Sequence, residues 1–243
     1  MNIFSNSQTL PSAEPFAETR TGANRIVIVF QGGGALGAYQ AGVYHALHDA
    51  GIEPDWIVGT SIGAINGALI VGNKPPNRIA ALEEFWRRMT QKSYWGPWSL
   101  WPKLTQYVAY GSTIASGLPN FFSPNPHAFL SPHFPLGAER AGYYSTAPLA
   151  ATLSQLVDLD LLNAKAPRLT VGAAEVTTSQ MHYFDSSGTR LGIEHILASG
   201  ALPPAFPAVR IDGKLYWDGG ILSNTPAEVV FDDHPRHNSL IFA

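Results

Sequence analysis

Three short segments of this sequence carry the groups that acyl transfer requires: a nucleophile, a base and donors for an oxyanion. Residues 59–63 read Gly-Thr-Ser-Ile-Gly, a G-x-S-x-G pattern. Gly59 and Gly63 permit a sharp strand-to-helix turn that exposes the oxygen of Ser61. The start of the following helix directs N–H groups and a positive dipole end at that oxygen. Ser61 is therefore the candidate nucleophile.

The candidate base and the candidate oxyanion site come from two further glycine-containing segments. Asp218 stands in Tyr-Trp-Asp-Gly-Gly, where desolvation beside Trp217 would raise its basicity and Gly219 and Gly220 leave room for a serine to approach. Taken alone, Asp-Gly-Gly indicates only a turn. A run of glycines follows an apolar stretch that ends at residue 30, and consecutive N–H groups in such a run can bind an anion. These glycines are Gly32, Gly33 and Gly34.

The surrounding residues predict the elements that position these groups. Residues 26–30 and 55–58 have the continuous apolar, β-branched character of strands buried on both faces. Each is followed by glycines and then by a helical pattern, which predicts βαβ units and a parallel sheet. Further expected elements are a helix after Pro75-Pro76, helices at 148–157 and 193–198, strands at 169–176 and 181–184, a hairpin at 209–217, and a strand that begins at Leu240.

Two of the motifs also have simpler interpretations. Ser61 could merely cap an ordinary strand-to-helix turn. Gly32, Gly34 and Gly37 also fit G-x-G-x-x-G, the fingerprint of dinucleotide binding, which needs an acidic residue at the end of the second strand. Here Asp55 opens that strand and Ser61 follows it, which argues against dinucleotide binding.

Taken together, the motifs resemble those of the patatin-like phospholipases. That family has G-G-G-x-[K/R]-G for an oxyanion hole, G-x-S-x-G for a nucleophile and D-G-[G/A] for the aspartate of a Ser–Asp dyad. This chain has GGGALG, GTSIG and DGG in the same order. A fourth segment, ASGALPPAFP at 198–207, is similar to the family's A-S-x-A-x-P-x-x-F-P stretch. The resemblance covers about residues 25–243.

The resemblance implies a three-layer α/β/α fold with a mostly parallel central sheet, and a lipid acyl hydrolase that needs no metal or organic cofactor. Ser61 would attack a fatty-acyl ester, and Asp218 would accept its proton. The oxyanion would be bound by the backbone N–H groups of Gly32, Gly33 and Gly34. The motif glycines would be Gly37, Gly59, Gly63, Gly219 and Gly220. Leu36 stands where the family usually has Arg or Lys, which widens the expected substrates from phospholipids to neutral acylglycerols, simple esters and acyl thioesters.

Other functions fit some of the same residues. An α/β-hydrolase would use Ser61, Asp218 and either His234 or His237 as a triad, but its nucleophile usually follows several strands rather than the second. A non-catalytic lipid- or nucleotide-binding module would keep the glycine loops without turnover. His45 and His48 lie one helical turn apart, but without an identifiable third ligand they are expected at the surface rather than on a metal.

Composition narrows the function further. The 243 residues suffice for one large domain, expected at 25–243 after a disordered leader at 1–24 that is rich in Ser, Thr, Pro and Ala. A net charge of −3 argues against nucleic-acid binding. The absence of cysteine excludes disulfides and a cysteine nucleophile. Neither a signal peptide nor a membrane span is recognisable, so a cytoplasmic location is expected.

Residues 93–138 differ in character from the rest of the chain. They hold a single formal charge, Lys103, and 7 of the 19 prolines. Their many aromatic residues include Trp95, Trp98, Trp101, Phe121, Phe122, Phe129 and Phe134. Trp and Phe partition well into lipid headgroup regions, so the segment fits a lid-like insertion that makes peripheral membrane contact. The same rings could instead fill an added layer of the core.

Overall fold

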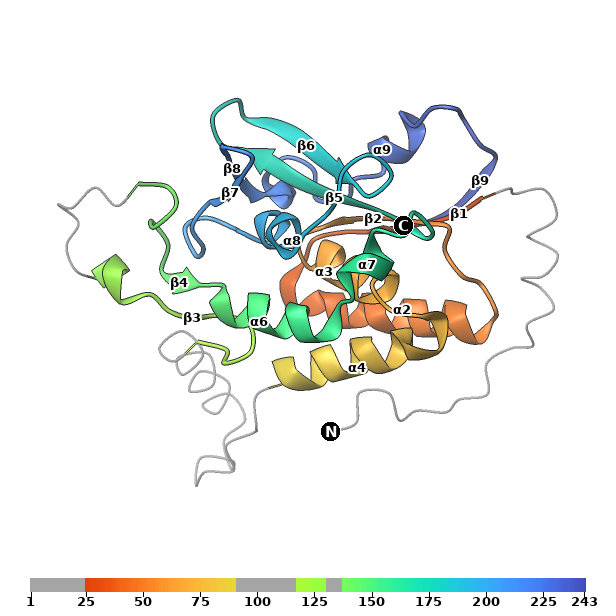
Figure 1. Ribbon diagram of the computed structural model, residues 1–243, viewed down its shortest axis with the longest axis horizontal. Helices are drawn as coiled ribbons and strands as arrows, with labels where there is room; N and C mark the ends of the chain where they lie inside the picture. Colours follow the sequence, from red (N-terminus) through yellow and green to blue (C-terminus); the bar gives the residue numbers. More distant parts are fainter. Residues whose placement is uncertain (1–24, 91–116, 130–136) are drawn as a thin grey trace, which may run out of the picture.

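The computed structural model describes residues 25–90, 117–129 and 137–243 (Figure 1). The strands are β1 (Arg25–Phe30), β2 (Trp56–Thr60), β3 (Ser123–Pro124), β4 (Tyr144–Ser145), β5 (Arg168–Glu175), β6 (Gln180–Asp185), β7 (Val209–Ile211), β8 (Lys214–Asp218) and β9 (Ser239–Phe242). The α-helices are α2 (Gly37–Asp49), α3 (Ile62–Val71), α4 (Arg78–Met89), α6 (Ala147–Leu156), α7 (Leu159–Leu162), α8 (Ile193–Ser199) and α9 (Glu228–Phe231). Short 3-10 turns are η1 (Gly34–Leu36), η2 (Pro75–Asn77), η4 (Pro126–Phe129) and η5 (Gly219–Ile221). Each helix and strand expected from the sequence within these ranges is present.

Seven of the strands form one sheet. β1 pairs in parallel with β2 on one side and with β9 on the other, and β2 pairs in parallel with β5. β6 and β8 run antiparallel to β5, and β7 runs antiparallel to β8. Five of the seven strands therefore point in one direction. The predicted α/β fold with a mostly parallel central sheet is confirmed.

β5 is the strand on which the two candidate catalytic segments meet. Residues 173–175 of β5 pair with both β6 and β8, so these two strands lie on opposite edges of β5. β6 also pairs with residues 170–172, which places β2 on the same edge as β8. Along that edge Thr60 is opposite Gly172, and Asp218 is opposite the next residue, Ala173. The end of β2 and the end of β8 are therefore adjacent.

The two faces of the sheet are covered unequally. Helices α2, α3, α4, α6 and α8 lie on one face (Figure 1), where they share a large core with alternate residues of β1. All ten residues of α3 are buried, as expected of a helix that is apolar on every side. On the other face, the described part of the chain supplies α9, whose Val230 packs on Val27, Val29 and Val58. The helix that follows Ser61 is thus the most completely buried of the described helices.

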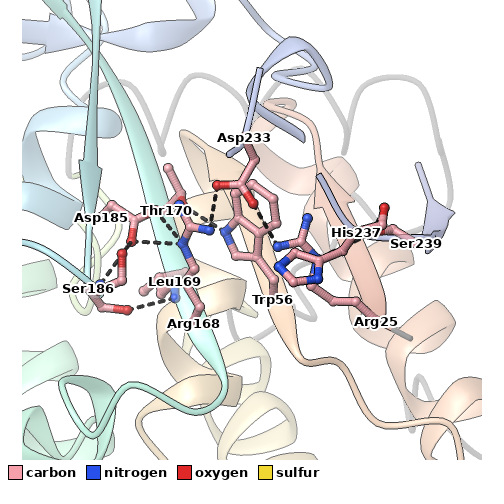
Figure 2. A network of polar contacts seen from close by, with 11 residues as sticks. Arg25, Trp56, Arg168, Leu169, Thr170, Asp185, Ser186, Asp233, His237 and Ser239 are labelled. Carbon is pink, nitrogen blue, oxygen red and sulfur yellow. Dashed lines mark hydrogen bonds and ion pairs between the residues drawn. The ribbon is translucent and has the colours of Figure 1, made fainter. Parts of the chain in front are cut away.

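An ionic cluster lies at the amino ends of the parallel strands (Figure 2). The guanidinium groups of Arg25 and Arg168 lie over the ring of Trp56, at 4.7 and 4.1 Å from its centroid. Both arginines bond to Asp233, at 2.7 and 2.8 Å, and Arg168 also bonds to Asp185 at 2.8 Å. These contacts attach the chain between α9 and β9 to β1 and β5.

The described part of the aromatic segment packs on the protein. Phe121 is partly buried against the large core. The ring centroid of Phe122 lies 4.7 Å from that of Tyr144 and 5.8 Å from that of Phe206, which belongs to the fourth motif. For these two rings, the interpretation as an added core layer is the one the structure favours. Trp95, Trp98, Trp101 and Phe134, on which the membrane interpretation mainly rests, lie outside the described residues, as does the leader 1–24.

Within the described ranges, no helix combines the length and apolar character that a membrane span requires.

Candidate active site

Ser61 occupies the turn between β2 and α3. Its backbone has φ +57° and ψ −124°, a conformation that costs an L-residue about 1–3 kcal/mol and persists only where the surroundings enforce it. The N–H groups of Ala64 and Ile65 donate to its carbonyl at 3.0 and 3.2 Å, so α3 begins at once. Ser61 is the N-cap by position, but its hydroxyl makes no capping bond. The simpler interpretation of Ser61 as a capping serine is therefore wrong, and its oxygen is left for another partner.

The glycines on either side of Ser61 are required by close approach of backbone to backbone. A Cβ on Gly59 would lie 2.5 Å from the carbonyl oxygen of Gly63. A Cβ on Gly63 would lie 2.3 Å from the carbonyl oxygen of Phe30, at the end of β1. The first turn of α3 thus packs directly on the neighbouring strand.

Asp218, the last residue of β8, is 3% exposed. Burial raises the pKa of its carboxyl, and hydrogen bonds from the Ser61 hydroxyl and the Gly220 N–H only partly offset that rise. The Gly220 N–H donates to Oδ1 at 2.7 Å. No charged side chain among its described neighbours contributes to this pKa. Because its pKa lies above the usual ~3.9, Asp218 is a stronger base than an aspartate in water.

The structure brings Ser61 and Asp218 together through the register of β5. Thr60 and Asp218 stand opposite consecutive residues of one edge of that strand, and Ser61 follows Thr60 directly. Ser61 consequently lies beside Asp218, and hydrogen bonding from the Ser61 hydroxyl is one of the influences that lower the pKa of that carboxyl. Gly219 allows the residue after Asp218 to pack closely on β5, since a Cβ there would lie 2.6 Å from the carbonyl oxygen of Gly172.

The glycine run at 32–34 lies beside the serine. A Cβ on Gly32 would lie 3.2 Å from the Cβ of Ser61. The Gly32 N–H donates to the main-chain carbonyl of Asn224 at 2.9 Å and is therefore occupied in this structure. Within the described part of the chain, the N–H groups of Gly33 and Gly34 have no protein acceptor. These two N–H groups are the ones left for an oxyanion.

Asn224 is a residue that the sequence analysis missed. Its carbonyl accepts the Gly32 N–H, and its Nδ2 donates to the Gly32 carbonyl at 3.2 Å. Its Oδ1 would lie 2.3 Å from a Cβ on Gly32 and 2.9 Å from a Cβ on Gly220. Asn224 therefore joins the glycine run to the loop that follows Asp218. No pattern in the sequence distinguishes this asparagine from any other loop asparagine.

The residues that follow the glycine run differ in their surroundings. Gly37 opens α2, and a Cβ there would lie 2.4 Å from Cγ1 of Ile62, so α2 approaches α3 closely. Leu36 is 70% exposed. At the position where the family pattern usually has Arg or Lys, this chain therefore exposes an apolar side chain to solvent.

The histidines considered from the sequence lie away from Ser61. Ser239 pairs with Arg25 at the amino end of β1, and its hydroxyl donates to the carbonyl of His237 (Figure 2). Ser61 lies at the opposite end of the neighbouring strand, roughly 20 Å away at about 3.3 Å per residue. The α/β-hydrolase triad would need His234 or His237 at that opposite end, so their place beside β9 argues against it.

The remaining candidate, a metal site on α2, is not formed. His48 contacts Glu53, and His45 lies 3.6 Å from Asp49. Among the described residues, no group of three or more metal-ligating side chains comes together.

Comparison with known families identifies the family to which this chain belongs. A family profile described as "Patatin-like phospholipase" matches residues 28–231, which include all four motifs. The chain belongs to the patatin-like phospholipase family. Within the family pattern, Leu36 remains the departure noted above.

Named relatives are longer than this chain. It is similar to patatin-like phospholipase domain-containing protein 7 of Rattus norvegicus, with 28% identity over 207 residues that cover 85% of this chain and 12% of that protein. A 42-residue stretch is 62% identical to lysophospholipase nte1 of Aspergillus terreus, covering 17% of this chain and 3% of that protein. The chain thus spans about an eighth or less of these curated relatives.

Among solved structures, the chain is similar to VipD from Legionella pneumophila. The TM-score is 0.48 at 17% sequence identity, covering 89% of this chain and 49% of that chain.

Proposed function

We propose that this protein is a serine acyl hydrolase that cleaves fatty-acyl esters of lipids through a Ser61–Asp218 dyad and a covalent acyl-enzyme. One observation carries the proposal. Ser61 is held in a strained elbow with its hydroxyl unused by the helix and facing a buried carboxylate of raised pKa. Membership of the patatin-like phospholipase family supports an ester of a lipid as the substrate.

In the first step, Oγ of Ser61 bonds to the carbonyl carbon of the ester while its proton passes to the Asp218 carboxylate. The carbonyl oxygen becomes an oxyanion, and the N–H groups of Gly33 and Gly34 donate to it. The bond between the carbonyl carbon and the alcohol oxygen then breaks. The departing alcohol takes the proton from Asp218, which leaves an acyl group on Ser61.

In the second step, water attacks the acyl carbon and gives a proton to Asp218. The bond to Oγ breaks, Ser61 recovers that proton, and the fatty acid leaves. Asp218 thus returns to its carboxylate form after each half of the cycle, and every proton that it accepts is given back. The dyad needs no histidine because burial raises the basicity of Asp218 itself.

The surface around the dyad supports a substrate that is presented by a lipid aggregate. Large exposed apolar side chains lie within or shortly after three of the four motif segments: Leu36, Tyr39, Leu202, Ile221 and Leu222. None of them directly follows the GTSIG segment, whose helix is buried. Exposed apolar side chains near the site lower the free energy needed to move an acyl chain from a lipid aggregate toward Ser61. The names of the relatives, phospholipase and lysophospholipase, support glycerophospholipids, and Leu36 supports adding neutral acylglycerols to the substrates tested.

A panel of esters tests the proposal. Hydrolysis of p-nitrophenyl esters, lysophosphatidylcholine and monoacylglycerol is compared among wild type, Ser61→Ala, Asp218→Asn and His237→Ala. We expect Ser61→Ala to lose at least about 10³-fold in kcat and Asp218→Asn about 10²–10⁴-fold. His237→Ala is the matched control and should retain wild-type kcat.

Two results would contradict the dyad. Turnover that survives Asp218→Asn but is lost in His237→Ala or His234→Ala would indicate a triad hydrolase. Lipid binding without turnover in the wild type would indicate a binding module.

A further inference from the structure

The segment 199–201, at the end of α8, hydrogen-bonds to the main chain of both members of the dyad. The hydroxyl of Ser199 accepts the N–H of Ser61 at 2.9 Å. The carbonyl of Ala201 accepts the N–H of Asp218 at 3.0 Å. The two acceptors are only two residues apart. The fourth sequence motif, which supplies neither the nucleophile nor the base, therefore spans the two.

Ser199 is itself fixed to the sheet. Its hydroxyl donates to the carbonyl of Gly172 at 2.6 Å, and the residue has no exposed surface. Gly172 is the residue of β5 opposite Thr60, and the residue after it is opposite Asp218. One hydroxyl thus connects the elbow to the point on β5 where β2 and β8 both end.

The N–H of Ser61 needs such a partner. It precedes the first turn of α3 and so has no acceptor within the helix. The positive φ of Ser61 is retained only where neighbouring groups hold the backbone. If the acceptor were removed, the strained turn could relax and the Ser61 side chain would rotate away from Asp218.

We infer that Ser199 is a positioning residue: its hydroxyl holds the Ser61 main chain at the elbow so that the Ser61 side chain faces Asp218. This role rests on the proposed function, because it presupposes that Ser61 and Asp218 act as nucleophile and base. A hydroxyl that only satisfied two buried polar groups would contribute to stability alone. The two roles predict different kinetics.

The test compares Ser199→Ala with Ser186→Ala. The Ser186 hydroxyl is also buried and also accepts a main-chain N–H, that of Leu169 at 2.9 Å, but at the far end of β5. Each variant removes a buried hydroxyl that accepts a main-chain N–H, one at each end of β5, and Ser199→Ala also removes the bond to the Gly172 carbonyl. Both should therefore lower the melting temperature, Ser199→Ala at least as much as Ser186→Ala. Only Ser199→Ala disturbs the elbow.

Kinetics with a p-nitrophenyl ester then separate the two roles. We expect Ser199→Ala to lower kcat about 10- to 100-fold with KM little changed, because a misplaced nucleophile costs turnover rather than binding. On acidification, kcat/KM of Ser199→Ala should also fall at a higher pH than that of the wild type. The reason is that the Ser61 hydroxyl lowers the pKa of Asp218, and the variant would lose that effect. Wild-type kcat in Ser199→Ala, or an equal loss in Ser186→Ala, would overturn the inference.

A measurement that does not depend on turnover keeps the inference separate from the proposed function. Crystal structures of the wild type and Ser199→Ala should show a longer separation between Oγ of Ser61 and the Asp218 carboxylate in the variant. If the wild type hydrolyses no ester, the proposed function fails, while an unchanged separation would still overturn the positioning role. Should Ser199→Ala not fold, Ser199→Cys replaces it, because a thiol fills similar space but accepts hydrogen bonds weakly.

Discussion

The two ends of the parallel strands are built in opposite ways. At the amino ends, charged side chains meet: Arg25 and Arg168 enclose Trp56 and share Asp233. At the carboxyl ends, about five residues further along the same strands, glycines and neutral hydrogen bonds surround a lone buried aspartate. β2 carries both characters, with Trp56 at one end and Thr60, next to Ser61, at the other.

The difference separates paired charges, which stabilise the fold, from the unpaired carboxylate of the proposed catalytic site. Opposite charges at the amino ends pair with one another, which holds the pKa of Asp233 and of Asp185 below the usual range. At the carboxyl ends, no cation among the described residues contributes to the pKa of Asp218, so burial raises that pKa, which suits the proposed role of this group as a base. Changes at one end should therefore affect stability, and changes at the other should affect turnover.

Apart from changes to Ser61 and Asp218 themselves, the largest effect is expected from a methyl group at the elbow. Gly63→Ala would place a Cβ 2.3 Å from the carbonyl oxygen of Phe30, which forces α3 away from β1. We expect a loss of esterase activity of more than about 100-fold, because the nucleophile moves with the helix. The control is Gly42→Ala in α2, where nothing lies within 4 Å of the added Cβ. Equal activity in the two variants would contradict the close-packing argument.

A smaller loss is expected at the link between the glycine run and the Asp218 loop. Asn224→Ala removes the Nδ2 bond to the Gly32 carbonyl while leaving the main-chain bond in place. We expect kcat to fall about 10-fold, because the oxyanion donors are no longer fixed, with about 1 kcal/mol of stability lost. Asn163→Ala, which removes bonds to the carbonyls of Leu159 and Leu191, is the control for stability. A kcat loss as large in that control would show that Asn224 acts only through stability.

At the amino ends the expected effect is on stability alone. Asp233→Asn leaves the guanidinium groups of Arg25 and Arg168 without their shared carboxylate. We expect the free energy of unfolding to fall by about 2 kcal/mol in urea denaturation, because Arg25 loses its carboxylate partner and Arg168 keeps only Asp185. Turnover at 20 °C should stay at the wild-type value. A fall in kcat without a fall in stability would break the division between the two ends.

The pH dependence sharpens the same comparison. Burial raises the pKa of Asp233, but bonds from both arginines outweigh it, so the folded-state pKa is below the unfolded value of ~3.9. The stability that Asp233 contributes is thus present above that pH and is lost as pH falls through its lower folded value. The pKa of Asp218 is raised instead, so on acidification its carboxylate is protonated at a higher pH than that of Asp233. Protonation removes the proposed base and with it the activity. On acidification, turnover should therefore be lost before fluorescence reports unfolding, and unfolding first would contradict the assignment.

Much of this arrangement could be predicted from local sequence. The apolar runs at 26–30 and 55–58 indicate buried parallel strands, and the glycines around Ser61 indicate the elbow that the structure shows. The hairpin at 209–217 and the last strand were also predictable, because turn residues and β-branched runs mark them. These features depend on neighbouring residues only.

Contacts between distant segments could not be predicted in this way. That β8 continues the edge of β5 where β2 ends is a matter of register, and no residue of either strand encodes it locally. Asn224 and Ser199 act through bonds to Gly32 and Ser61, far away in sequence. For the same reason the ionic cluster around Trp56 was not foreseen, since its members come from four separate segments.

Covalent labelling tests the central claim most directly. The protein is treated with an alkyl fluorophosphonate, and the modified peptide is identified and its rate of formation measured by mass spectrometry. The account predicts a single adduct on Ser61 that forms at least about 100-fold more slowly in Asp218→Asn and at the wild-type rate in His237→Ala. An adduct on a different residue, or a rate that is indifferent to Asp218, would contradict it.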